Sequence, residues 1–161
     1  MRSFEKISFD QFKKDISGNS ELYEEYKLPE RKTRASAGYD FFAIKEIILL
    51  PGEIKKIPTG VKARFPEDEF LMLVVRSSMG FKHNVRMCNQ VGIIDSDFYN
   101  SPGNEGHMWV ALQNQGDMIV KIRKGEAFCQ GIFQKYYTCG EEVETKREGW
   151  SWDGATQKIK K

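Results

Sequence analysis

Asp95 is the residue of this sequence best placed to act as a base. It follows two apolar residues of a predicted strand, Ile93 and Ile94, and the cluster Asp95-Ser96-Asp97 then turns the chain. A carboxylate at the end of a rigid strand is held in place, as a catalytic base requires. Acids at such a position also cap turns without any chemical role. An isolated Asp-Ser-Asp cluster favours the turn role, so the neighbouring motifs must decide between the two interpretations.

The segment Arg76-Ser77-Ser78-Met79-Gly80 has the residue types of a phosphate site, and it follows an apolar segment at 70–75. Arginine supplies forked donors, serine a hydroxyl, and glycine lets backbone N–H groups approach a ligand closely. The Gly-Lys-Ser/Thr ending of a P-loop is missing, and the segment taken alone favours a strand-to-turn junction over a phosphate site. Gln130 lies in a later apolar segment, where it is either a hydrogen-bonded core amide or a residue that positions a water in a site.

The histidines and cysteines form no metal-binding pattern. His83 and His107 are far apart in the sequence and lack zinc-ligand spacing, so we interpret both as surface or structural residues. The three cysteines are odd in number and have no paired spacing, which favours reduced thiols. They are Cys88, Cys129 and Cys139.

Length and charge indicate a single cytoplasmic domain. The chain has 161 residues and a net charge of +2. This length can bury a hydrophobic core, and the nearly neutral charge does not support a nucleic-acid or membrane surface. No apolar run reaches the length of a membrane span. The N-terminus lacks the apolar region of a signal peptide, so we expect a cytoplasmic location.

Short strands separated by turn signals dominate the chain after residue 37, which predicts an all-β sandwich or barrel of the jelly-roll type. Before them, a capping-box pattern at Ser8 and Gln11 predicts a short helix over 8–17, and the polar residues 19–34 read as a connector. We expect 85–88 and 91–94 to form the two arms of a hairpin. The predicted strands are 39–43, 46–50, 53–62, 70–75, 85–88, 91–94, 108–113, 118–122 and 128–137.

The composition changes after Cys139. Residues 140–161 are charged and rich in Gly, Ser and Thr, which predicts a flexible C-terminal tail. Trp150 and Trp152 belong either to a loosely docked tail or to an arm that closes over a ligand and stacks a ring on it. The expected division is a helical extension and connector at 1–34, a β domain at 35–139 and a flexible arm at 140–161.

Four of these segments, taken in chain order, resemble the motifs of the trimeric dUTP diphosphatase (dUTPase) family of bacterial or phage type. The resemblance runs from about residue 35 to residue 133, which is most of the domain. The N-terminal helical segment is also similar to an extension found in some bacterial and phage members. The four motifs are Ala37-Gly38-Tyr39-Asp40, Arg76-Ser77-Ser78-Met79-Gly80, Asn89 to Phe98, and Gly125-Glu126-Ala127-Phe128-Cys129-Gln130.

The chain departs from the family pattern at three places. Its fifth motif, 147–156, keeps Arg, aromatic, Gly and Thr residues but lacks the usual Gly-Gly-Phe-Gly-Ser-Thr-Gly spacing. Phe98 stands where the family commonly has Tyr, so the ring is kept and the hydroxyl is lost. Val75 stands where Pro often precedes the Arg-Ser pair.

The resemblance implies a jelly-roll-like β domain that forms homotrimers with active sites at the subunit interfaces. The implied reaction is hydrolysis of dUTP to dUMP and pyrophosphate, with Mg²⁺ on the triphosphate. Asp95 would be the base that activates a water, and Asp40 would reach the metal through water or brace the second motif. The remaining residues implied to contact the phosphates or the attacking water are Arg76, Ser77, Ser78, Gly80 and Gln130.

The third motif is implied to recognise the uracil and the deoxyribose. Asn89 and the backbone near Gly92 and Ile94 would pair with the base, in a space too tight for a 5-methyl group. The Phe98 ring would lie against the sugar and exclude a 2′-hydroxyl. The residues implied to close over the nucleotide are Arg147, Trp150, Trp152 and Thr156.

Two rival functions remain to be distinguished. A dCTP deaminase of the same fold uses a glutamate in the strand after the third motif, where this chain has Ala111, and this difference disfavours deamination. A non-catalytic or regulatory dUTP-binding protein on the same fold is supported only by the altered fifth motif. Release of pyrophosphate from dUTP separates an enzyme from such a binding protein.

Overall fold

The structure is a computed structural model and describes residues 1–140, 145 and 147. Its strands pair antiparallel throughout, as the predicted all-β class requires. The strands are β1 (Ser3–Lys6), β2 (Tyr39–Phe42), β3 (Ile47–Leu49), β4 (Ile54–Pro58), β5 (Val61–Arg64), β6 (Glu69–Val75), β7 (Val85–Met87), β8 (Gly92–Asp95), β9 (Trp109–Asn114), β10 (Val120–Ile122) and β11 (Ala127–Lys135). The helices are α1 (Phe9–Asp15), α2 (Ser20–Glu25), α3 (Ser77–His83) and the 3₁₀ helix η1 (Ser96–Phe98).

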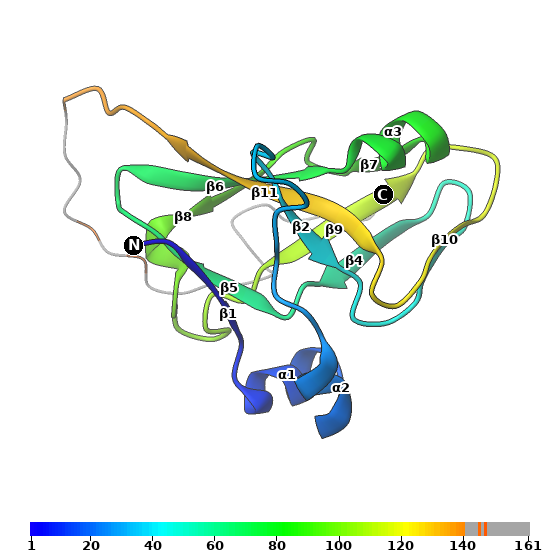
Figure 1. Cartoon of the computed structure of the whole chain (residues 1–161), viewed down its shortest axis with the longest axis horizontal. Coiled ribbons are helices and arrows are strands. Elements are labelled where there is room, and N and C mark those ends of the chain that lie inside the picture. The colour runs from blue at the N-terminus through cyan, green and yellow to red at the C-terminus, as the bar shows by residue number, and fades with distance from the viewer. Residues whose placement is uncertain (141–144, 146, 148–161) are drawn as a thin grey trace, which may run out of the picture.

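Two larger sheets enclose the main core (Figure 1). One has the strand order β2-β11-β6-β8 and the other β4-β9-β7, while β1-β5 and β10-β3 form separate pairs. Buried and partly exposed residues alternate along β6 and β9, as expected of strands with one face on a core. The core is built from both sheets, and its fully buried members include Phe41, Leu71, Leu112 and Phe128.

The predicted hairpin between 85–88 and 91–94 is wrong. β7 pairs with β9, whereas β8 pairs with β6, so the two strands belong to different sheets. The turn between them passes the chain from one sheet to the other, with Gln90 at a φ of 64° and its N–H donating to the carbonyl of Met87. This crossing places the Asn89 turn at one end of β8 and Asp95 at the other.

The N-terminal segment is more ordered than predicted. β1, which the sequence analysis missed, pairs with β5, and the predicted connector 19–34 contains α2, with Asn19 as its N-cap. The predicted helix over 8–17 is confirmed as α1, and Ser8 caps it. Figure 1 shows α1 and α2 side by side below β1 and β5. A second small core holds this extension together, with Ile7, Phe12, Tyr26 and Ile44 buried in it.

His107 is structural, in agreement with the sequence interpretation. Its ring is 1% exposed, and Nε2 accepts a hydrogen bond from the Gly60 N–H at 2.9 Å. The Nδ1 atom therefore carries the proton that Asp15, at the end of α1, accepts at 2.5 Å. Burial lowers the pKa of His107, and the Asp15 carboxylate opposes that effect. This pair attaches the N-terminal extension to the β domain.

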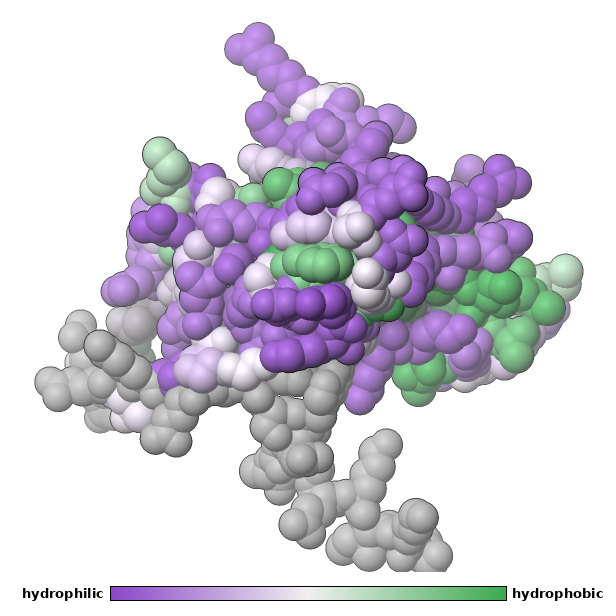
Figure 2. Space-filling model, turned by 90° about the horizontal axis from the view of Figure 1, so that it is seen from below, coloured by the Kyte–Doolittle hydropathy of each residue, from purple (hydrophilic) through white to green (hydrophobic). Residues whose placement is uncertain are grey.

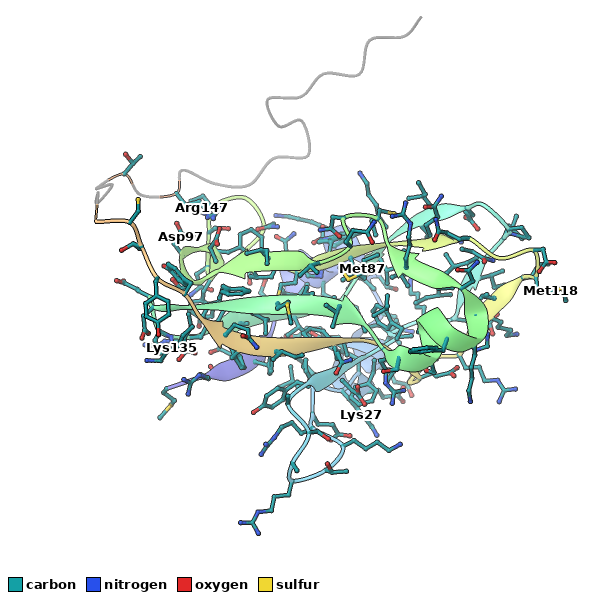
Figure 3. All side chains as sticks on the ribbon, turned by 90° about the horizontal axis from the view of Figure 1, so that it is seen from above. Lys27, Met87, Asp97, Met118, Lys135 and Arg147 are labelled. Carbon is teal, nitrogen blue, oxygen red and sulfur yellow. The ribbon has the colours of Figure 1, made fainter. Side chains whose placement is uncertain are left out.

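One end of the molecule exposes several apolar side chains. Figure 2 shows them in green at the right-hand end of its face, the end at which Figure 3 places Met118. They come from β3, the β3–β4 turn, the first residue of β4 and the residues before β10, and they are Ile48, Leu50, Ile54, Met118 and Ile119. Among the described residues, no helix is long and apolar enough to cross a membrane.

Candidate functional site

A polar cavity of about 350 Å³ collects residues of the first, second and fourth motifs. Asp40 comes from β2 and Gln130 from β11, where the two residues are paired across the sheet. Arg76 follows β6 and is the N-cap of α3, whose first residues are Ser77 and Ser78. β11 also pairs with β6, so three neighbouring strands bring these motifs together. The lining residues are Lys32, Ser36, Gly38, Asp40, Arg76, Ser77, Ser78 and Gln130.

The polar cavity is braced by Asp40. Its Oδ1 forms an ion pair with Arg76, with 3.1 Å between Oδ1 and Nε, and both side chains are partly exposed. Gly38 allows the Gln130 side chain to lie over the backbone, since a Cβ on Gly38 would come within 2.1 Å of Gln130 Oε1. The glycine therefore allows the Gln130 carboxamide to take its present position, which a Cβ at Gly38 would force it to leave.

The second motif differs from the predicted strand-to-turn junction, because Ser77 begins the helix α3. Gly80 lies within this helix and does not line the polar cavity. A Cβ there would meet no heavy atom within 4 Å outside its own helix and its chain neighbours. The role predicted for Gly80, a close backbone approach to a ligand, remains a prediction.

An apolar cavity of about 300 Å³ lies beside the third motif. Asn89 and Gly92 line it from the turn before β8 and from the first residue of β8. A Cβ on Gly92 would come within 3.1 Å of the Leu73 side chain, so glycine keeps the wall of the cavity close to β6. None of its lining residues is acidic, and Ala111 is among them. The set is Lys56, Leu73, Met87, Cys88, Asn89, Gly92, Ile93, Ile94, Trp109, Val110 and Ala111.

Asp95 lies at the end of β8 with its side chain 58% exposed. Arg147 Nη2 donates to Asp95 Oδ2 at 2.6 Å, and Arg147 Nε donates to Asp97 Oδ1 at 2.8 Å. Figure 3 shows Arg147 and Asp97 side by side, at the end of the molecule opposite Met118. The hydrogen bond to Asp97, supported by the charge of Asp95, raises the pKa of the Arg147 guanidinium. Arg147 is thus fixed as a cation next to the third motif.

Phe98 is more buried than we expect of a residue whose ring contacts a ligand. It is 8% exposed and belongs to the main core, at the end of η1. The guanidinium carbon of Arg147 lies 5.7 Å from the centroid of its ring. Its predicted contact with a sugar remains a prediction, and little of the residue is exposed to make it.

Within one chain, the candidate residues are divided among cavities that share no lining residue. Ser77 and Gln130 line the polar cavity, and Asn89 lines the apolar cavity. Asp95 lines a third cavity of about 550 Å³, which also contains Asp97. Trp150, Trp152 and Thr156 lie outside the described residues. In the described part of a single chain, Asp95 thus does not share a cavity with Ser77 and Gln130.

Sequence reasoning missed two residues of the polar cavity, Lys32 and Ser36. They lie just before the first motif, and Lys32 belongs to a stretch that was interpreted as a connector. The available signal was a cation and a hydroxyl within a few residues of Gly38. It becomes recognisable only in the structure, where Lys32 and Ser36 line one cavity with residues of α3 and β11.

The chain is similar to known proteins in sequence and in fold. The dUTPase family model matches residues 24–151 of this chain. The chain belongs to the dUTPase family. Deoxyuridine 5′-triphosphate nucleotidohydrolase from Lactococcus lactis is 43% identical over 130 residues, which cover 80% of this chain and 87% of that protein. The enzyme of the same name from Photorhabdus laumondii is 33% identical over 133 residues, covering 78% of this chain and 84% of that protein.

A solved dUTPase has the same fold. The crystal structure of dUTPase from Streptococcus mutans superposes with a TM-score of 0.70 at 34% identity, covering 86% of this chain and 99% of that chain. The match confirms the jelly-roll-like dUTPase fold that the sequence predicted. The family match includes Arg147 and ends at residue 151, before Trp152 and Thr156, where the fifth motif departs from the family spacing.

Proposed function

We propose that this chain hydrolyses dUTP to dUMP and pyrophosphate at a site built from Asp95, the apolar cavity and the polar cavity. The observation that carries the proposal is the position of Asp95, which is solvent-accessible at the end of β8 and follows directly on a wall of the apolar cavity. In the cell this reaction limits the incorporation of uracil into DNA and supplies dUMP for dTMP synthesis.

Asp95 is the general base. It orients a water and takes its proton as the water attacks the α-phosphorus in line with the departing pyrophosphate. The oxygen of the water forms a bond to the α-phosphorus, and the bond from that phosphorus to the bridging oxygen of the pyrophosphate breaks. Most of the rate enhancement comes from positioning and from neutralisation of charge, because phosphoryl transfer needs little covalent help from the protein.

The polar cavity binds the phosphates. Arg76 contacts them with its guanidinium, Ser77 and Ser78 with their hydroxyls, and Gln130 with its carboxamide, which also serves to hold the attacking water. Asp40 acts through Arg76, because their ion pair sets the direction in which the guanidinium points. The Gly38–Gln130 packing supports this assignment by fixing the Gln130 carboxamide over the first motif.

The apolar cavity binds uracil. Asn89 and the backbone of Gly92 and Ile94 pair with the polar edge of the base, and the close wall at Gly92 rejects the methyl group of thymine. A polar site left unpaired by cytosine discriminates strongly against that base. Phe98 lies against the sugar. The absence of any acid among the lining residues of this cavity supports hydrolysis over the deamination of dCTP.

Each active site is completed by other copies of the chain in a homotrimer. The support is the division of the site, since Asp95 and the polar cavity do not meet within one subunit. Arg147 and the residues 150, 152 and 156 close over the bound nucleotide. The ion pair of Arg147 with Asp95 supports the assignment of Arg147, because it puts this residue next to the third motif.

Mg²⁺ would be the cofactor, held mainly by the triphosphate of the substrate. Among the described residues, no group of three or more His, Cys, Asp or Glu side chains could hold an ion, and Mg²⁺ is commonly bound by one or two carboxylates together with substrate phosphates. Asp40 is the carboxylate in the polar cavity that could reach it, through water. When bound, Mg²⁺ offsets the negative charge of the phosphates.

The direct test is pyrophosphate release from dUTP, dTTP, dCTP and UTP, with and without Mg²⁺. We expect release from dUTP alone, and only when Mg²⁺ is present. Tight binding of dUTP without release would instead identify a regulatory dUTP-binding protein. Release of ammonia from dCTP would identify a deaminase.

A further inference from the structure

A short basic loop forms one side of the polar cavity. It spans 31–39 and carries Arg31, Lys32 and Arg34. Its base is closed by a pair of backbone hydrogen bonds, in which the Asp40 N–H donates to the Glu30 carbonyl at 2.8 Å and the Glu30 N–H donates to the Asp40 carbonyl at 3.3 Å. The loop therefore starts and ends at the strand that carries Asp40.

Hydrogen bonds inside the loop determine which of its cations faces the cavity. Arg31 Nη1 donates to the carbonyl of Arg34 at 3.1 Å, and its guanidinium lies over the Tyr39 ring. The hydroxyls of Thr33 and Ser36 are 2.7 Å apart, and the Thr33 N–H donates to Ser36 Oγ. Arg31 is thus used to shape the loop, while Lys32 and Ser36 line the cavity.

Lys32 adds a second positive charge to the polar cavity, beside that of Arg76. The Arg76 guanidinium is already paired with Asp40, and Arg147 is paired with Asp95 and Asp97. Within the part of the chain that the structure describes, Lys32 makes no ion pair. A triphosphate is a polyanion, and an ammonium on a flexible stem binds phosphate as a point charge.

We propose that Lys32 binds the part of the triphosphate that leaves as pyrophosphate, with the Ser36 hydroxyl beside it. This inference rests on the proposed function, in which the α-phosphorus is attacked by the water that Asp95 holds. Gln130 of the polar cavity is assigned to the attacking water, so the phosphates remote from the base are the ones left for Lys32 and Ser36, which line the same cavity. Lys32 is therefore a substrate-binding residue that recognises phosphate chain length.

The test compares Lys32→Gln, Lys32→Arg and the matched control Lys27→Gln, which removes an exposed lysine of the same segment that does not line the cavity. Calorimetry measures binding of a non-hydrolysable imido analogue of dUTP and of dUMP, both with Mg²⁺. We expect Lys32→Gln to lower the affinity for the analogue about tenfold, because one charge-assisted contact is lost. The affinity for dUMP should fall less than about twofold, because dUMP lacks the phosphates that Lys32 contacts. Lys32→Arg keeps the charge and retains most of the affinity, and Lys27→Gln binds both ligands like the wild type.

Steady-state kinetics in the same preparations separate this proposal from the proposed function. We expect Lys32→Gln to raise the KM for dUTP about tenfold, with kcat nearly unchanged, because the contact is made equally in the ground and transition states. If the wild type is active and Lys32→Gln binds the analogue as tightly as the wild type does, the proposed role of Lys32 is overturned and the proposed hydrolysis stands. An equal loss of affinity for the analogue and for dUMP also overturns the role of Lys32. A wild type that binds the analogue but releases no pyrophosphate overturns the proposed hydrolysis and leaves the binding comparison intact.

Discussion

The guanidinium of Arg147 lies 2.6 Å from the carboxylate of Asp95, so the first residue of the fifth-motif segment contacts the proposed base within the same chain. The same guanidinium reaches Asp97 and lies near the Phe98 ring. Three side chains of the third motif thus define a position for Arg147. A triphosphate that enters the site competes with these carboxylates for the guanidinium.

Removal of Arg147 should lower the turnover of dUTP. We expect Arg147→Ala to reduce kcat/KM about 30-fold, because one forked, charge-assisted contact to phosphate is lost. Arg147→Lys should recover only part of the loss, since an ammonium cannot donate in a fork. The control is Lys135→Ala, which removes an exposed cation that pairs with Asp68 outside the three cavities. Wild-type kinetics in Arg147→Ala would exclude a role for this residue in closing over the substrate.

A methyl group on Gly38 should damage the polar cavity. The added Cβ would lie 2.1 Å from Gln130 Oε1, so the Gln130 carboxamide must move. We expect Gly38→Ala to lower kcat at least about tenfold, because small displacements of positioning groups have large effects on rate. Gly18→Ala is the matched control, since a Cβ there meets no heavy atom within 4 Å beyond its chain neighbours. Equal rates in the two variants would show that Gln130 does not need its present position.

The His107–Asp15 pair should make stability sensitive to acid. The folded-state pKa of His107 is lowered, so the unfolded chain binds more protons once the pH falls below the ordinary value of 6.5. The pair is therefore fully effective above that value, and folding stability decreases as the pH falls from there toward the lowered pKa. Glu105, which partly opposes the shift, is held by Ser8 and Lys62.

Thermal unfolding measures this effect directly. We expect the Tm of the wild type to decrease more between about pH 7.5 and about pH 5.5 than the Tm of His107→Gln, because the variant has no titrating ring at this position. His107→Gln should be less stable than the wild type at the higher pH, because the buried contact to Asp15 is altered. Parallel Tm losses in the two proteins would assign the acid sensitivity to other groups.

Restoring tyrosine at Phe98 should change sugar selection little. The ring is 8% exposed and packs in the main core, so its position is set by the core and not by a hydroxyl. We expect Phe98→Tyr to alter the ratio of kcat/KM for dUTP over UTP less than about threefold, the scale of one weak contact. A gain in discrimination of about 100-fold would show that the missing hydroxyl carries the selection.

The sequence predicted the strands best where apolar residues alternate. The segment 70–75 and the segment 108–113 are confirmed as β6 and β9 with small shifts at their ends. β1 was missed because Phe4 is its only strongly apolar residue, and its partner β5 is far away in the sequence. The hairpin at 85–94 was wrong because local pattern does not reveal which sheet each strand joins. Pairing partners are a property of the whole fold.

The sequence predicted most of the residues of the candidate site, but it did not predict which of them share a cavity. Arg76, Ser77 and Gln130 meet in one cavity, as motif order suggested, because β11 pairs with β6. Lys32 was missed because a basic loop has no periodicity that distinguishes a ligand contact from a solvated surface. Its contribution depends on the Arg31 hydrogen bond that shapes the loop. The separation of Asp95 from the polar cavity likewise follows from the three-dimensional arrangement alone.

The most direct test of the proposed mechanism is pyrophosphate release from dUTP by Asp95→Asn, measured beside binding of the imido analogue. The substitution keeps the size of the side chain and removes its ability to take a proton from water. We predict that turnover falls at least about 1,000-fold while the affinity for the analogue changes less than about threefold, as expected when a general base is lost from an otherwise intact site. Turnover within about tenfold of the wild type would contradict the assignment of Asp95 as the base.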